Sequence, residues 1–239
     1  MNNIGFTVTD GWAYRFLFST FLCDKLIQDN KITVYCSAYY KSIIEESNKH
    51  ENLHIELINY KLPMMFVFFV KILNYLYKNV NDFKVNTYHI KRMKGFKKLL
   101  HKFFKSFLKN FNNKCLFRYE KFLRIYFSNI ISDNKYKVDK IFFLSPYSLQ
   151  ELYFSLSINN LETKLFFILP SWDNIYKYYT FKHYDYYYVW GNSQKVFFEN
   201  ILEIKSPVHT KGPISQYMFN YYKNIYETEN NNENEVKIF

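Results

Sequence analysis

The chain has 239 residues, of which 49% are hydrophobic and 22% are charged, a composition typical of a globular protein with a sizeable buried core. Its five glycines and five prolines exclude collagen-like, glycine-rich and proline-rich architectures. The formal net charge is +11, which favours partners that carry negative charge.

Cysteine usage and hydropathy indicate the compartment. The three cysteines include no Cys-x-x-Cys pair, which argues against a disulfide framework and favours a reducing cytoplasm. The most hydrophobic segment, Met64 to Val70, has seven residues, whereas a membrane-spanning helix needs about 20. Charged residues interrupt the first thirty positions, where a signal peptide needs a continuous apolar stretch. We predict a cytoplasmic protein that is soluble or peripheral to a membrane.

The first sixty residues predict three strands and a helix. Alternation of apolar and small residues from Ile4 to Val8 indicates a strand that ends at Asp10. Apolar residues then recur with helical spacing over about four turns, up to Ile27. Further strands are predicted at 32–36 and 53–58. A strand, a helix and a second strand form a right-handed crossover unit, which implies parallel pairing.

The rest of the chain extends this pattern. Residues 61–131 lack strand signals and are predicted to be mainly helical, whereas strands are predicted again at 140–144, 165–169 and 186–190. Ser145 followed by Pro146 predicts an N-cap and the first residue of a helix, and a further helix is predicted at 193–203. Continuous apolar runs in the strands are typical of parallel sheets covered on both faces. The predicted fold class is α/β, with a Rossmann-like open parallel sheet flanked by helices and a basic helical insertion.

One segment holds the whole charge excess. Between Lys84 and Arg124 there are 13 Lys or Arg residues and one acidic residue, Glu120, a net charge of +12, and the remaining chain carries −1. Within it, apolar residues with helical spacing alternate with lysines, which predicts a basic amphipathic helix over 96–108. The residues expected to bind an anionic membrane surface are Phe96, Lys97, Lys98, Phe103, Phe104, Lys105 and Phe107.

Two other interpretations of this helix stay open. It is also typical of a surface helix that packs on the core and exposes its lysines to water. Nucleic acid is a third partner that lysines and aromatic residues can bind, although no nucleic-acid-binding motif occurs in the sequence.

The predicted domain covers residues 1–226. Residues 227–235 form an acidic, asparagine-rich spacer, and Val236 to Phe239 is a β-like apolar tetrapeptide. The tetrapeptide resembles the first strand of a second domain whose remainder is absent, with a frayed tail as the alternative.

Polar and aromatic residues follow the predicted strands, where open α/β sheets bind their ligands. Asp10 is a candidate general base, with helix capping as the alternative. The tryptophan of the 171–174 stretch is a platform for a sugar ring, and its Asp and Asn are partners for hydroxyl groups; the alternative is a core tryptophan and a capping aspartate. The candidate substrate-binding residues are Gly11, Trp12, Ser145, Ser171, Trp172, Asp173 and Asn174.

Other groups of residues in the sequence give weaker indications of a functional site. His183 and Asp185 are a candidate polar pair, with simple surface placement as the alternative. His50 and His54 have i, i+4 spacing, but the second falls in a predicted strand, so no metal site is predicted. The dinucleotide fingerprint, the phosphate-binding loop and the nucleophile elbow are absent from the sequence.

Four motifs together resemble the amino-terminal half of GT-B glycosyltransferases that build bacterial surface carbohydrate. They are Ile4–Gly11 (IGFTVTDG), Ser171–Asn174 (SWDN), Asp185–Gly191 (DYYYVWG) and Lys211–Pro213 (KGP). The resemblance follows the order of the strands along the chain, whereas residues 61–131 match mainly in being helical.

The resemblance implies an acceptor-binding domain for surface or lipid-linked carbohydrate, docked on the inner face of the cytoplasmic membrane. It implies no metal and no cofactor in this half. The nucleotide-sugar donor belongs to a second domain, or to a separate carboxy-terminal half, so that residues 1–239 alone are expected to be inactive. The alternative from another class is a peripheral membrane-binding module without enzymatic activity.

Overall fold

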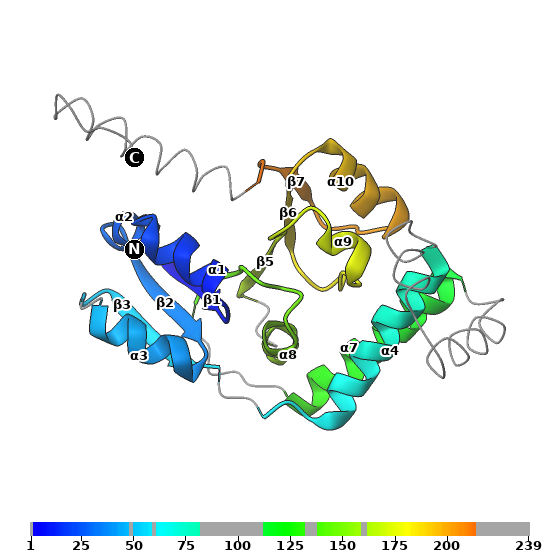
Figure 1. The fold of residues 1–239 in the computed structure, drawn as a ribbon, viewed down its shortest axis with the longest axis horizontal. Coiled ribbons are helices and arrows are strands. Elements are labelled where there is room, and N and C mark those ends of the chain that lie inside the picture. Colours follow the sequence, from blue (N-terminus) through cyan, green and yellow to red (C-terminus); the bar gives the residue numbers. More distant parts are fainter. Residues whose placement is uncertain are drawn as a thin grey trace, which may run out of the picture.

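A computed structural model describes residues 2–47, 50–58, 61–81, 112–131, 138–158 and 162–213. In this part of the chain seven parallel strands form one open sheet flanked by helices (Figure 1). The strand order is β3-β2-β1-β4-β5-β6-β7, so the order reverses between β1 and β4. The predicted α/β class with an open parallel sheet is therefore confirmed.

The sheet contains all six predicted strands and one more. Its members are β1 (Asn2–Val8), β2 (Asn30–Cys36), β3 (Leu53–Leu57), β4 (Lys140–Phe143), β5 (Lys164–Ile168), β6 (Tyr186–Val189) and β7 (Val208–Thr210). The sequence analysis missed β7, because three residues with a single buried side chain, Val208, are too few to show a strand period.

Short helices cover one face of the sheet over β1 to β3. They are α1 (Gly11–Tyr14), the π-helical segment η1 (Arg15–Ser19), α2 (Leu22–Ile27) and α3 (Ala38–Ser47). The first three replace the single four-turn helix that the sequence predicts. The interruption falls at Phe21, whose φ of 52° is left-handed and cannot continue a helix.

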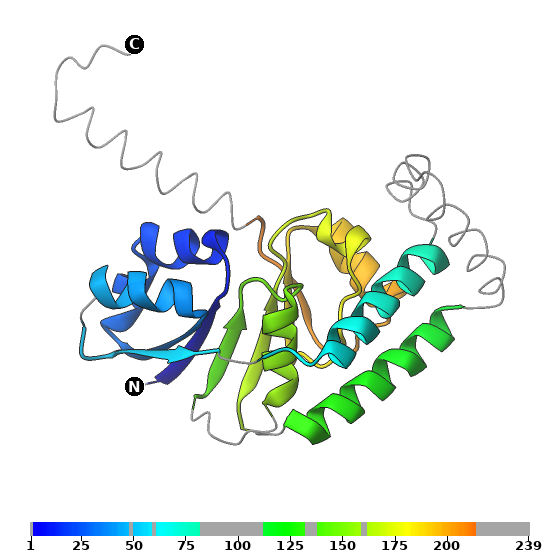
Figure 2. The same ribbon diagram turned by 60° about the horizontal axis from the view of Figure 1, so that its bottom comes forward.

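Two long helices and several shorter segments cover the other face. They are α4 (Met64–Asn81), α7 (Asn113–Ile131), α8 (Leu149–Ser157), α9 (Asn174–Lys177), α10 (Asn192–Val196) and the π-helical segment η2 (Phe197–Ile201). Helices α4 and α7 run side by side in opposite directions (Figure 2), with Phe66 of α4 and Phe127 of α7 at 5.0 Å between ring centroids. These two helices confirm the prediction that residues 64–81 and 113–131 are helical.

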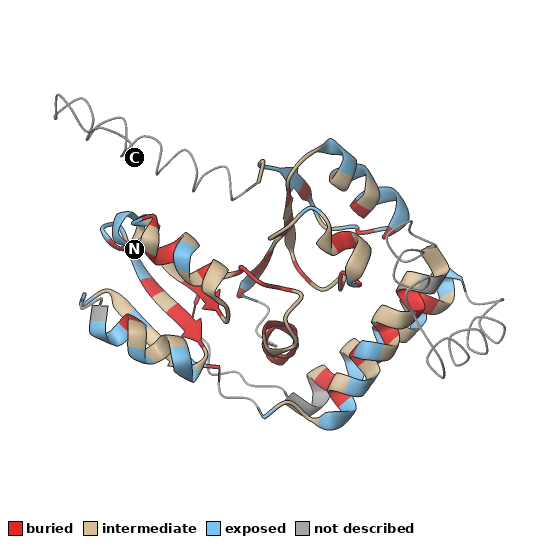
Figure 3. Ribbon diagram, viewed as in Figure 1, coloured by how far each residue is buried: buried red, intermediate tan, exposed pale blue. Residues whose placement is uncertain are grey.

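Helix α8 lies between this helical pair and the sheet. Its rings contact both neighbours: Tyr153 packs on Phe66 of α4, and Phe154 packs on Phe143 of β4. Residues 151–157 are all buried (Figure 3). The helix begins after Ser148, whose hydroxyl accepts the Glu151 N–H, so the prediction that Ser145 is the N-cap was wrong.

Some predictions lie outside the described residues. These are the basic helix of 96–108 with its membrane-binding residues, and the spacer and tetrapeptide of 227–239. Among the helices that the structure describes, none combines the length and the apolar character needed to cross a lipid bilayer.

Candidate functional site

A pocket of about 330 Å³ opens at the carboxyl ends of β1, β4 and β5. It lies at the point where the strand order reverses, because helices on opposite faces of the sheet diverge there and leave a crevice. The lining residues are Asp10, Trp12, Ser145, Tyr147, Ser148, Pro170, Ser171, Asn174 and Tyr178. Five of these, including Asp10 and Asn174, are residues that the sequence analysis selected.

Asp10 joins the first helix to the fourth strand. Its Oδ1 accepts hydrogen bonds from the backbone N–H groups of Trp12 at 3.0 Å and Ala13 at 2.9 Å, so it caps α1. Its Oδ2 accepts a hydrogen bond of 2.5 Å from the Ser145 hydroxyl. The capping interpretation is therefore confirmed. A carboxylate has about four lone-pair directions, so Oδ2 can still accept one hydrogen bond from a ligand.

Ser145 links Asp10 to a second carboxyl group, that of Glu151. The Ser145 hydroxyl donates to Asp10, and its backbone N–H donates to Glu151 Oε2 at 2.9 Å. The Thr9 hydroxyl donates to the other oxygen of Glu151 at 2.7 Å. The two carboxyl groups thus hold Ser145 from both sides and fix the direction of its hydroxyl.

Burial changes the protonation of Glu151. The residue is fully buried, and removal from water raises the pKa of its carboxyl to about 7. Hydrogen bonds from threonine hydroxyls and from the Ser145 N–H act in the opposite direction, whereas the negative charge of Asp10 adds to the rise. The carboxyl of Glu151 therefore holds its proton to a higher pH than an exposed glutamate does.

The sequence analysis missed Glu151, although a signal for it exists. Ser148 and Glu151 form the Ser-x-x-Glu pattern of a capping box at the start of α8. The serine hydroxyl accepts the Glu151 N–H at 3.1 Å, as in a capping box. The glutamate, however, bonds Ser145 and Thr9 instead of the backbone of the N-cap, and only the tertiary fold brings Thr9 to it.

Aromatic rings form the apolar part of the pocket. Trp12 stacks on Phe16 with 5.8 Å between ring centroids, and Tyr147 lies 5.6 Å from the ring of Tyr178. The Tyr147 hydroxyl bonds Thr180 at 2.7 Å, and burial raises its pKa, so the ring stays neutral. Flat neutral rings beside polar groups are typical of sites that bind sugar rings.

The loop after β5 supplies the remaining polar groups. Ser171 and Asn174 line the pocket, and the Asn174 N–H donates to the Ser171 carbonyl at 3.2 Å. Within the described residues the Asn174 carboxamide makes no hydrogen bond, so its two donors and its acceptor are available to a ligand.

Two neighbours in this loop differ from the prediction. The Trp172 side chain does not line the pocket, nor is it core: the residue is 53% exposed and its ring meets Tyr176 edge-on at 6.3 Å. Asp173 bonds the Ser171 hydroxyl at 2.7 Å and pairs with Lys177. These partners, with Lys177 the strongest, lower its pKa. Asp173 makes no capping hydrogen bond to α9, so that alternative was wrong as well.

The other predicted groups lie elsewhere. Gly11 begins α1 and does not line the pocket. His183 and Asp185 do not pair, because the histidine bonds the Ser155 hydroxyl at 2.8 Å and the aspartate accepts the Leu165 N–H at 2.8 Å. Among the described residues, no three His, Cys, Asp or Glu side chains are grouped so that they could hold a metal ion.

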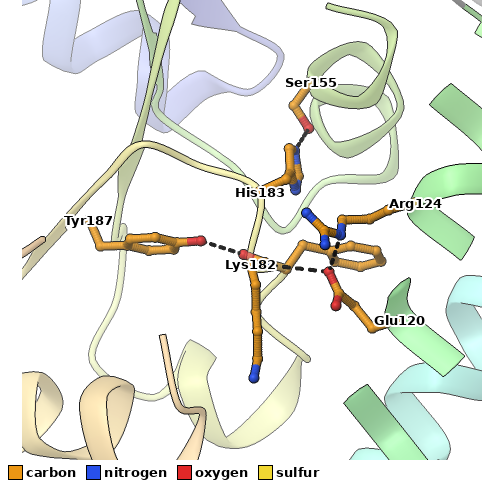
Figure 4. Close-up of polar contacts among 7 residues, drawn as sticks. Glu120, Arg124, Ser155, Lys182, His183 and Tyr187 are labelled. Carbon is orange, nitrogen blue, oxygen red and sulfur yellow. Dashed lines mark hydrogen bonds and ion pairs between the residues drawn. The ribbon is translucent and has the colours of Figure 1, made fainter. Parts of the chain in front are cut away.

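A second polar cluster joins α7 to the loop before β6 (Figure 4). Glu120 is buried, and its Oε1 lies 2.9 Å from Arg124 Nε and accepts the Lys182 N–H at 3.3 Å. Burial, with a smaller effect of the Arg124 charge, lowers the pKa of His183 to about 3, so its ring is neutral. Tyr187 donates to the Phe181 carbonyl at 2.7 Å. These contacts hold the loop before β6 against α7 and α8, which indicates a structural role.

Comparison with protein-family models, with curated proteins and with solved structures finds no match to this chain. The groups that line the pocket themselves indicate what it can bind. A carboxylate, a serine hydroxyl that it orients, and a carboxamide without other described partners surround a space bordered by neutral rings. This arrangement can bind a neutral molecule with several hydroxyl groups.

Proposed function

We propose that this pocket binds a carbohydrate acceptor, and that the chain is the acceptor-binding part of a glycosyltransferase for surface or lipid-linked carbohydrate. The observation that carries the proposal is the meeting of Asp10, Ser145 and Asn174 with the rings of Trp12 and Tyr178 in one pocket. Hydroxyl groups of a sugar would bond the polar side chains while its apolar face packs on a ring.

Asp10 has a place in the proposed transfer. As the acceptor oxygen forms a bond to the anomeric carbon of a nucleotide-sugar, its proton would pass to Oδ2 of Asp10 and the nucleotide would leave. The Ser145 hydroxyl and the N-terminus of α1 hold the carboxylate in position. The donor nucleotide-sugar would be bound by a second domain, in the same or in another polypeptide.

Trp172 has a supporting role in this proposal. Its ring is exposed beside Ser171, which lines the pocket. An acceptor longer than one sugar unit would extend over this ring, because exposed tryptophan offers a large apolar surface at little conformational cost.

The test is saturation-transfer NMR of the full chain with a panel of mono- and oligosaccharides. Asp10→Asn keeps the helix cap and removes the charge, and we expect it to weaken binding about tenfold or more, as expected for a hydrogen bond to a charged group. Asn174→Ala should weaken it by a similar factor. The matched controls Asp24→Asn and Asn200→Ala change exposed residues outside the pocket and should leave binding unchanged.

Two results would contradict this proposal. One is that no saccharide of the panel binds. The other is that a saccharide binds with an affinity that neither Asp10→Asn nor Asn174→Ala changes, which would place its site elsewhere.

The basic segment supports a membrane-associated location for this function. The net charge of +12 between Lys84 and Arg124 would draw the chain to anionic lipid, where such an acceptor would be found. Sedimentation with anionic vesicles should fall with salt and should be lost when Lys97, Lys98, Lys102 and Lys105 are changed to Glu. Recruitment that survives this change would overturn the membrane part and leave the pocket proposal intact. Vesicle binding together with an inert pocket would favour the non-enzymatic membrane module.

A further inference from the structure

A chain of side-chain hydrogen bonds leads from the buried Glu151 to the pocket. Its first link joins the Thr9 hydroxyl to Glu151 Oε1 at 2.7 Å. Its second link joins Thr9 Oγ1 to Ser148 Oγ at 3.4 Å, and either of these two oxygens can donate. Ser148 lines the pocket, whereas Glu151 is fully buried. A buried carboxyl group is thus connected, through one intervening hydroxyl, to a hydroxyl of the pocket wall.

The ionised form of Glu151 sets the direction of both hydroxyls. A carboxylate only accepts hydrogen bonds, so the single hydroxyl hydrogen of Thr9 points to Oε1. The hydrogen in the link between Thr9 and Ser148 must then come from Ser148. Ser148 Oγ also accepts the Glu151 N–H at 3.1 Å, which leaves it one lone pair. Towards the pocket, Ser148 is therefore only an acceptor.

Protonation of Glu151 reverses these directions. Oε2 faces the Ser145 N–H at 2.9 Å, a group that only donates, so the proton belongs on Oε1. Glu151 then donates to Thr9, and the Thr9 hydrogen turns towards Ser148. Both lone pairs of Ser148 Oγ are now in use, one by Thr9 and one by the Glu151 N–H. The Ser148 hydrogen is released to the pocket, where the residue becomes a donor.

A second threonine beside Glu151, Thr7, leads away from the pocket. A hydrogen bond from its hydroxyl also lowers the pKa of Glu151. Its oxygen, however, already accepts the Leu144 N–H at 3.0 Å and lies 3.4 Å from the Phe142 carbonyl, to which the hydroxyl donates. A reversal that ran through Thr7 would end at this carbonyl and leave the pocket unchanged.

The charges around Glu151 favour its neutral form. Burial raises the pKa of its carboxyl to about 7, and the negative charge of Asp10 adds to the rise. Burial also keeps titratable groups of the neighbouring loops neutral, because it raises the pKa of the tyrosines and lowers that of the histidine, and the two charged groups of α7 pair with each other. These groups are Tyr147, Tyr184, His183, Glu120 and Arg124.

We propose that Ser148 is a specificity-determining residue of the pocket, and that the proton on Glu151 acts through Thr9 to set whether Ser148 donates to a ligand or accepts from it. The reversal needs no movement of the oxygens. When a proton enters at Ser148, the serine passes its hydrogen to Thr9, and Thr9 passes its own hydrogen to Glu151 Oε1. Ser148 keeps the new hydrogen, so one proton is taken up and every hydroxyl is restored.

The consequence for a ligand rests on the proposed carbohydrate function. A sugar hydroxyl has one hydrogen, and the carboxylate of Asp10 accepts it. With Glu151 ionised, Ser148 needs a further hydrogen from the ligand. With Glu151 protonated, Ser148 instead donates to a lone pair of the same hydroxyl or of its neighbour. We therefore expect the pocket to bind a neutral sugar more tightly when Glu151 is protonated.

The first test measures the affinity of the full chain for methyl glucoside by NMR at about pH 5.5 and about pH 8.5, on either side of the pKa of Glu151. We expect the wild type to bind about threefold to tenfold more tightly at the lower pH, the factor that one neutral hydrogen bond provides. Ser148→Ala should abolish this ratio, whereas Ser193→Ala, the same change at an exposed residue outside the pocket, should keep it. Equal affinities of the wild type at the two pH values, or a ratio that survives Ser148→Ala, would overturn the proposal.

Glu151→Gln gives a second reading that leaves the N-cap of α8 in place. Its carboxamide oxygen can accept the Ser145 N–H while its NH₂ group donates to Thr9, so the variant directs the hydroxyls as the protonated acid does. It should bind methyl glucoside at the higher pH as tightly as the wild type does at the lower pH. Glu199→Gln, the same change at an exposed residue, should keep the ratio of the wild type. A Glu151→Gln variant that binds as weakly as the ionised wild type at both pH values would contradict the proposal.

Neutron diffraction from deuterated crystals of the ligand-free chain decides the reversal without a sugar. At the lower pH we expect deuterium on Glu151 Oε1 and a Ser148 deuterium directed into the pocket. At the higher pH the Ser148 deuterium should point to Thr9. The same Ser148 direction at both pH values, or a Glu151 deuterium bonded to Thr7, would overturn the proposal. If neither methyl glucoside nor the rest of the saccharide panel binds, the carbohydrate function fails, while this measurement still decides the reversal.

Discussion

The two ends of the sheet are built differently on the faces that the described helices leave open. Helix α8 packs on the centre of one face of the sheet. Where this face continues over β2 and β3, it carries a polar hollow of about 460 Å³, lined among others by Lys31, Thr33, His54 and Glu56. Over β4 to β7, the opposite face carries a row of rings from Phe142 to His209. A polar open face is stable in water, whereas an aromatic one is stable only when covered.

The two ends of the same parallel sheet therefore differ in whether their open face is stable in contact with water. The β3 end needs no further element, because its sequence LHIEL alternates as a strand with one wet face does. The β7 end carries a row of rings on its open face, and a covering element or ligand would stabilise such a face. Four measurements test the contrast, beginning with the largest expected effect.

Phe166→Ala should cost about 3–5 kcal/mol of unfolding free energy, the usual range for a buried phenylalanine. The residue is 7% exposed, and its ring stacks on Phe142 at 4.6 Å and on Tyr186 at 4.8 Å. Denaturant unfolding measures the loss. A cost under about 1 kcal/mol would show that the aromatic row is surface and not core.

Glu151→Gln probes the junction between the two halves, where β1 meets β4. Because burial raises the pKa of Glu151 from 4.5 to about 7, the folded state binds its proton more tightly than the unfolded state does. Its stabilising contribution is therefore complete below pH 4.5 and is lost as the pH rises through about 7. The unfolding free energy of the wild type minus that of the variant should fall by about 3 kcal/mol across this window.

Taking this difference cancels the contribution of His183, which titrates in the opposite sense. The matched control is Glu199→Gln, which makes the same substitution at an exposed residue of η2. A difference for Glu151→Gln that stays flat with pH would mean that the carboxyl of Glu151 is hydrated in solution.

Gly5→Ala tests how tightly β1 packs against side chains of its two neighbouring strands, β2 and β4. A Cβ at Gly5 would lie 2.9 Å from Cε2 of Tyr35 and 3.0 Å from Cγ1 of Ile141. Both side chains are buried, so neither moves without displacing its neighbours. Overpacking costs about 1–3 kcal/mol, and the lower chain entropy of alanine returns about 0.5–1 kcal/mol. We expect a net loss of about 1 kcal/mol in thermal or denaturant unfolding; a gain in stability would show that the Tyr35 ring is loosely held.

His54→Ala should have the smallest effect, within about 0.5 kcal/mol. His54 lies on the polar open face, and its only described ionic partner is Glu56 at 3.3 Å, with side-chain exposures of 70% and 39%. The measurement is the same unfolding titration as for Phe166→Ala. A loss comparable to that of Phe166→Ala would remove the distinction between the two open faces.

Sequence analysis predicted some residues of the candidate site but not all of them. Asp10, Ser145, Ser171 and Asn174 were selected because each follows a predicted parallel strand, and parallel strands end at one edge. Trp172 and Asp173 were selected by the same rule but do not line the pocket, and Asp173 pairs with Lys177 instead. Strand order predicts which loops meet, but it does not predict where each side chain in a loop points.

The sequence by itself determined six of the seven strands, their parallel pairing and the α/β class, because strand period, apolar runs and crossover handedness are local properties of the chain. Tertiary structure decided the rest. The pairing of β7 with β6 and the contact of Thr9 with Glu151 both join residues that are distant in sequence. The proton affinity of Glu151 is the clearest case, since it is set by burial, which no local pattern encodes.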